Sequence, residues 1–207
     1  TLDIIGEYSY DTFVFEKFDL VAEDNAVLSI LGSLDIKNIF NSNLNINGNN
    51  FPSKILLQLI KNFDLSKFNP ALPEGTLNQF DISLKGSDIF INNFEYISNL
   101  LTKINLKGKV KNLDLLNSTF TIQVNSSSSN EIKNIAENLL SGIAIPDVSF
   151  NQFELDALIE NNNFIVNSLT LEDKETILES SGRMNLDNSL DRSFNLKLSN
   201  FKKSEIL

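Results

Sequence analysis

The stretch Ser181-Gly182-Arg183-Met184-Asn185-Leu186 is followed, twelve positions after its glycine, by the alternating run Phe194-Asn195-Leu196-Lys197-Leu198. Two earlier parts of the chain have the same form, a glycine-containing run and then, again twelve positions on, an alternating apolar run. They are Gly32-Ser33-Leu34-Asp35-Ile36 with Leu44-Asn45-Ile46, and Gly108-Lys109-Val110-Lys111-Asn112 with Phe120-Thr121-Ile122-Gln123-Val124. The three glycines are 76 and 74 residues apart (108 − 32 and 182 − 108). We therefore predict a β unit repeated about every 75 residues, with Gly32, Gly108 and Gly182 as its landmarks.

The strands predicted near these landmarks are apolar on one face only. In one of them, Phe120, Ile122 and Val124 alternate with Thr121 and Gln123. Because successive side chains of a strand point to opposite faces, such strands build a sheet with one apolar and one polar face. The candidate residues for lining the apolar face are Phe80, Ile82, Leu84, Phe120, Ile122, Val124, Phe153, Leu155, Phe194, Leu196 and Leu198.

This pattern predicts a mainly β chain with a few short helices, in which residues 1–207 form one continuous, repeat-built domain. The expected architecture is a long curved antiparallel sheet, a repeating β-groove or half-pipe, because a sheet of a dozen or more strands twists and curls. Two interpretations of its apolar face remain open. The face is either a dry core closed by the helices, or a groove that stays open to a hydrophobic ligand.

Three meanders of short strands are predicted, over residues 4–46, 80–124 and 150–198. The first has four or five strands. In the third, Ile177–Leu178 and Gly182–Leu186 are separate strands. For the segment Phe94–Leu101, one helical turn within a loop is one interpretation, and its conformation is left open.

Helices are predicted between the meanders, where apolar residues recur at helical spacing. One begins at Pro52 and includes Phe63, and a second carries Ile132, Ile135, Ala136, Leu139 and Leu140 on one stripe. A serine of the preceding polar tract caps the second helix, and Glu131 lies favourably in its first turn. A third helix is expected after Phe201.

Composition excludes several classes of function. The chain has 27 acidic and 17 basic residues, a net charge of −10, so nucleic acid is not an expected partner. It contains no Cys and no His, which removes thiolate chemistry, disulfides and the commonest metal ligand. Carboxylate pairs occur at Glu23-Asp24, Glu172-Asp173 and Glu154-Leu155-Asp156, in predicted turns or on the polar face of a strand. We therefore expect no enzyme, no cofactor and no catalytic or metal site.

The glycine landmarks are joined by two further recurring motifs. Leu72-Pro73 and Ile145-Pro146 end the helical regions, and Asn78-Gln79-Phe80-Asp81-Ile82 matches Asn151-Gln152-Phe153-Glu154-Leu155. From Phe13 to Leu198, this arrangement resembles the AsmA-like family (AsmA, TamB and YhdP type) of Gram-negative envelopes.

The resemblance implies a periplasmic, repeating β-groove protein, anchored in the inner membrane by an N-terminal helix. Such a protein would carry phospholipid or another acyl-chain ligand, or assist outer-membrane assembly with envelope protein partners. The anchor is missing here, so we expect this chain to be a segment of a longer protein. The alternative is a closed β scaffold that mediates protein–protein contacts, such as a GspN-like component of type II secretion.

Overall fold

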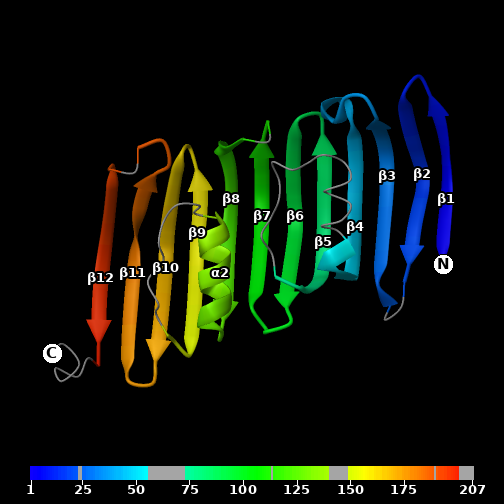
Figure 1. Ribbon diagram of the computed structural model, residues 1–207. Coiled ribbons are helices and arrows are strands. Elements are labelled where there is room, and N and C mark those ends of the chain that lie inside the picture. The colour runs from blue at the N-terminus through cyan, green and yellow to red at the C-terminus, as the bar shows by residue number, and fades with distance from the viewer. Residues whose placement is uncertain (23–24, 56–72, 113, 140–148, 189, 201–207) are drawn as a thin grey trace.

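The computed structural model describes residues 1–22, 25–55, 73–112, 114–139, 149–188 and 190–200. They form one open, curved sheet of twelve antiparallel strands, in which every strand pairs with its neighbours in the chain (Figure 1). The strands are β1 (Leu2–Ser9), β2 (Thr12–Val21), β3 (Val27–Asp35), β4 (Asn43–Pro52), β5 (Gly75–Lys85), β6 (Asp88–Ser98), β7 (Lys103–Lys111), β8 (Asp114–Ser126), β9 (Gln152–Glu160), β10 (Asn163–Asp173), β11 (Thr176–Asn185) and β12 (Arg192–Ser199). A 3₁₀ turn, η2 (Ile39–Asn41), and a helix, α2 (Ser129–Leu139), accompany them. The predicted fold class is confirmed.

The strands are longer and fewer than some predictions had them. The first meander has four strands, and Ile177–Leu178 and Gly182–Leu186 belong to one strand, β11. Gly182 lies inside β11 and does not end it. Its positive φ accommodates a local distortion, and the pairing of β11 with β12 continues on both sides of this glycine. In the segment Phe94–Leu101, whose conformation the sequence left open, β6 continues to Ser98 before the chain turns.

The second predicted helix is confirmed over its described residues, whereas the first begins one residue later than predicted, because Pro52 still pairs with Thr76 in the sheet. Helix α2 begins at Ser129, and the preceding Ser128 accepts a hydrogen bond from the backbone N–H of Glu131 through its Oγ, at 3.4 Å. After Pro52, the last residue of β4, residues 53–55 are helical. The rest of that predicted helix, Leu140 and the helix expected after Phe201 lie outside the described residues.

The three landmark glycines occupy one position in a unit of four strands. They lie in β3, β7 and β11, and each has a positive φ, of 116°, 144° and 159°. On one side each glycine pairs with the first apolar residue of the following run, which is Leu44, Phe120 or Phe194. On the other side, each lies next to a β-bulge in the preceding strand, after Phe15, Ile91 or Val166. The chain therefore folds as three equivalent units, β1–β4, β5–β8 and β9–β12.

The bulges change which residues of a strand share a face. In β6, Ile91 pairs with Gly108 and Phe94 pairs with Leu106, so three steps along β6 match two along β7. One extra residue inverts the alternation, so Ile91 and Phe94 lie on the same face of the sheet. Such bulges also bend and twist the strands, which favours the observed curvature.

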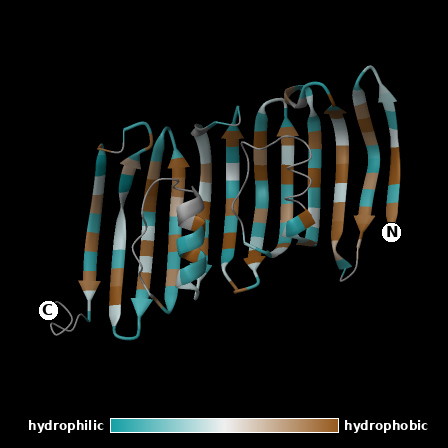
Figure 2. Cartoon of the chain, viewed as in Figure 1, coloured by the Kyte–Doolittle hydropathy of each residue, from teal (hydrophilic) through white to brown (hydrophobic). Residues whose placement is uncertain are grey.

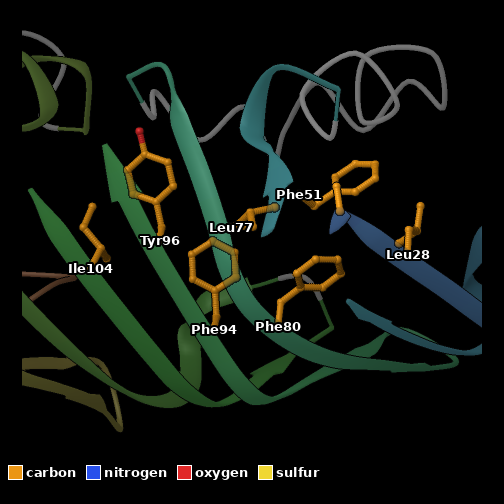
Figure 3. Close-up of a cluster of buried hydrophobic side chains, with 8 residues drawn as sticks. Leu28, Phe51, Leu77, Phe80, Phe94, Tyr96 and Ile104 are labelled. Atoms are coloured by element: carbon orange, nitrogen blue, oxygen red, sulfur yellow. The ribbon is translucent and has the colours of Figure 1, made fainter. Parts of the chain in front are cut away.

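The main buried cluster lies against the first two units (Figure 3). Its members come from strands β3 to β7 and the turn before β3, and the ring of Phe80 meets that of Phe51 edge to face at 6.4 Å. They are Ala26, Leu28, Phe51, Leu77, Phe80, Phe94, Tyr96 and Ile104. Ile135 of α2 packs against this cluster, so the helix covers part of the same face.

Helix α2 is held to the sheet by a buried carboxylate. Glu131 accepts hydrogen bonds from Ser98 Oγ, at 2.7 Å, and from Thr102 Oγ1. Thr102 Oγ1 also lies 2.6 Å from Ser126 Oγ, and all four residues are buried. The nearby Tyr96 hydroxyl donates to the Pro73 carbonyl, and burial together with the charge of Glu131 raises the pKa of Tyr96 well above its usual range.

Replacing Glu131 with alanine should loosen α2 from the sheet. The change leaves the buried hydroxyl of Thr102 without its carboxylate acceptor, and we expect a loss of about 2 kcal/mol in the free energy of unfolding. Hydrogen exchange of the α2 amides and urea unfolding measure the effect. Asn130→Ala, an exposed change in the same turn, is the matched control. Equal protection of α2 in both variants would show that Glu131 does not hold the helix.

Candidate functional site: the apolar face of the sheet

Strand register places all of the predicted lining residues on one face. Ile46 pairs with Ile82, which pairs with Ile91, and the same row continues through Gly108 to Phe120. Parallel rows contain Leu84, Ile122, Val124, Phe153 and Leu155. They reach Phe194, Leu196 and Leu198 in β12. We call this surface the apolar face, and Figure 2 shows apolar residues on every strand, interleaved with hydrophilic ones.

Exposure along the apolar face changes from the middle of the sheet to its two ends. Phe80 is 3% exposed and Phe120 is buried. Ile82, Leu84, Ile122, Val124, Phe153 and Leu155 are half-buried. In β12, by contrast, Leu196 is 71% exposed and Leu198 is 51% exposed. In β1, Leu2, Ile4 and Tyr8 are exposed as well. The face is thus closed over the main cluster and open at both ends.

Several central residues of this face are absent from the predicted set. Phe94 and Tyr96 of β6 are buried, and they pair with Phe80 and Leu77 of β5. Simple alternation along β6 would assign Phe94 and Tyr96 to the face opposite Ile89 and Ile91. The signal that could have located them is the repeat, because the bulge sits at the same place in β2, β6 and β10.

The opposite face is mainly polar, with a few apolar residues such as Leu158 and Ile165, and it forms hydrogen bonds across the strands. Asp156 accepts from Asn167 Nδ2 at 2.6 Å and from Gln123 Nε2 at 2.9 Å, and these bonds hold the pKa of that carboxyl below its usual value. Glu95 accepts from Asn78 Nδ2 at 2.8 Å and pairs with Lys103, which lowers the pKa of Glu95 as well. This face therefore satisfies its polar groups within the sheet and in water.

In the described part of the chain, the carboxylate pairs noted in the sequence do not come together into one acidic site. Glu154 and Asp156 lie on the polar face and accept amide hydrogen bonds, and Glu172 and Asp173 end β10. Among the described residues, no three acidic side chains group closely enough to hold a metal ion. The pair Glu23-Asp24 lies outside these residues.

No helix in the described part of the chain is both long enough and apolar enough to cross a bilayer. No protein-family model, curated protein sequence or solved structure matches this chain. The resemblance to AsmA-like proteins therefore stays a prediction.

Proposed function

We propose that the apolar face binds the acyl chains of phospholipid, and that this chain is a non-enzymatic segment of an AsmA-like protein. In this proposal it lies in the periplasm and serves lipid transport or outer-membrane assembly. The observation that carries the proposal is the apolar face, which continues through all twelve strands and remains exposed at β1 and β12.

The dimensions suit acyl chains. Twelve strands at a spacing of about 4.8 Å give a sheet roughly 50 Å wide. One leaflet of a bilayer contributes about 15 Å of hydrocarbon, so several chains could lie along the face. Each methylene of an acyl chain that is removed from water contributes about 0.8 kcal/mol to the free energy of binding. Such binding requires no specific polar contact. The polar opposite face would meanwhile stay in contact with water.

The proposal is tested by photo-crosslinking to lipid. A photoreactive side chain at Ile122, on the apolar face, should crosslink phospholipid in bacterial envelopes or in vesicles of phosphatidylethanolamine and phosphatidylglycerol. The same group at the adjacent Thr121 is the matched control, because Thr121 is exposed on the polar face. We expect at least a tenfold difference between the two positions, since the polar face around Thr121 offers acyl chains much less apolar surface, with Leu158 as the apolar cross-strand neighbour. Equal labelling of both positions, or no lipid at Ile122, would contradict the proposal.

Ile122→Glu separates an open groove from a closed scaffold. In an open groove the variant stays folded and loses lipid uptake, because the carboxylate can remain hydrated. In a closed core the same carboxylate would be buried without a partner and would prevent folding. Circular dichroism alongside fluorescent-lipid uptake distinguishes the two, and unfolding of the variant would favour the closed scaffold that binds protein partners.

A further inference from the structure

The polar face carries a local concentration of positive charge, although the chain as a whole has a net charge of −10. This charge lies on β7, where four of the nine residues are lysine and none is acidic. The lysines are Lys103, Lys107, Lys109 and Lys111. Because they alternate with residues of the apolar face, such as Leu106 beside Ile122, all four side chains lie on the polar face.

The ring of Phe90 brings a lysine of another strand next to this row. Phe90 of β6 pairs with Lys109 on one side and with Ser83 on the other, so it lies on the polar face as well. The Nζ atom of Lys109 is 4.8 Å from the centroid of the ring, and that of Lys85, at the end of β5, is 5.4 Å from it. Attraction to the π electrons of the ring therefore holds two ammonium groups from different strands beside one another.

The charge of these lysines is only partly neutralised. We call Lys85, Lys107, Lys109 and Lys111 the lysine patch. Asp88 forms an ion pair with Lys109 at 2.5 Å, and this contact holds the pKa of Asp88 below its usual value. Asp114, opposite Lys111, is a second carboxylate beside the patch. Lys85, Lys107 and Lys111 are exposed, and within the described residues none of the three forms an ion pair. The patch thus keeps a surplus of positive charge that faces water.

Acidic residues beyond the patch limit the size of its ligand. The row that contains Lys109 continues through Thr119 to Glu160 of β9, two strands away and thus roughly 10 Å from Lys109. Glu154 and Asp156 lie on the same face of β9. Exposed charges that are more than about 8 Å apart are largely screened at physiological ionic strength. A compact anion on the patch is therefore attracted, whereas an extended anionic surface such as a bilayer would also meet these carboxylates.

We propose that the lysine patch binds a compact, soluble anion that carries two or more phosphate groups. Lysine binds phosphate as a point charge on a flexible stem. Lys107 and Lys109 alternate on one strand, with Cα atoms roughly 6.7 Å apart, so each can contact a different phosphate group of one ligand. The hydroxyl of Thr119, exposed beside Lys109, adds a hydrogen-bond donor. The proposal is independent of lipid binding, since the patch lies on the opposite face of the sheet.

Isothermal titration calorimetry with tripolyphosphate tests the proposal. We expect one ligand to bind per chain, and its affinity to fall as salt is added, because the attraction is electrostatic. Lys107→Gln should weaken binding about fivefold, which is the factor that one lysine contributes near an anionic lipid surface. Lys197→Gln is the matched control, because Lys197 lies on the polar face of β12 and its replacement changes the net charge equally.

Phe90→Leu distinguishes an arranged site from general attraction between charges. The substitution keeps every charge but removes the ring that holds Lys85 and Lys109 together. We expect tripolyphosphate to bind about two- to fivefold more weakly to this variant. Circular dichroism checks that the variants are folded. If Phe90→Leu is unstable, Lys107→Gln keeps the test decisive, because the Lys107 side chain is exposed.

The absence of binding at millimolar tripolyphosphate in low salt would overturn the proposal. Equal weakening by Lys107→Gln and Lys197→Gln would also overturn it, because only the net charge would then matter. Citrate, which carries carboxylates and no phosphate, should bind less tightly, and equal affinity would show that the patch does not recognise phosphate. Vesicles of phosphatidylglycerol should not bind through the patch, and their loss with Lys107→Gln would assign it to a membrane surface instead.

Discussion

Replacing Gly108 with alanine should lower the free energy of unfolding by about 3 kcal/mol or more. Gly108 has a φ of 144°, which L side chains rarely adopt. A Cβ at this position would lie 2.3 Å from the carbonyl oxygen of Thr119 and 2.5 Å from the Cα of Phe120. Both obstacles are backbone atoms of β8, an interior strand paired on both sides, so the clash cannot be relieved by a side-chain rotation. Urea unfolding followed by circular dichroism measures the loss.

Gly86 and Gly182 provide the controls for this prediction. Gly86 also has a positive φ, of 63°, but a Cβ there would meet only the carbonyl oxygen of Phe40, at 3.3 Å. Gly86→Ala should therefore cost about 1 kcal/mol, and Gly86→Asn less, because asparagine tolerates this conformation. Gly182→Ala should cost less than Gly108→Ala, because the clashing strand β12 lies at the edge and can shift. Equal losses at Gly86 and Gly108 would show that conformation alone, and not close backbone approach, requires the landmark glycines.

Phe80→Ala should lower the free energy of unfolding by about 3 to 5 kcal/mol. The Phe80 ring is almost fully buried and contacts Phe51 edge to face, and its removal leaves a cavity in the main cluster. Leu198→Ala on the same apolar face should change stability by less than about 0.5 kcal/mol, because half of that side chain is already in water. The comparison is measured by urea unfolding.

These two variants separate the closed part of the apolar face from its open ends. If Leu198→Ala destabilised the chain as much as Phe80→Ala, the exposed end of the face would be closed in solution. If neither substitution changed the free energy of unfolding, the cluster around Phe80 would not be a packed core. With the expected result, lipid-uptake experiments can target β12 without loss of the fold.

Much of the architecture could be predicted from residues that lie close together in the chain. The spacing between Gly182 and Phe194, present three times, identified the repeat of about 75 residues, and alternation in β5, β8, β9 and β12 identified their apolar side. Alternation failed in β6, where Phe94 and Tyr96 follow a bulge. A bulge inserts one residue without any strong composition signal, and it becomes visible only when the partner strand is known.

The sequence by itself determined the repeat, the antiparallel meander and the side of each regular strand that is apolar. These properties depend on turns and on period-two alternation, which are local. Only the tertiary structure decided how deeply each apolar residue is buried. Phe120 and Phe194 occupy equivalent positions after equivalent glycines, yet Phe120 is buried and Phe194 is 42% exposed. The physical reason is the neighbour, because β9 packs beside β8, whereas no described strand packs beside the outer edge of β12.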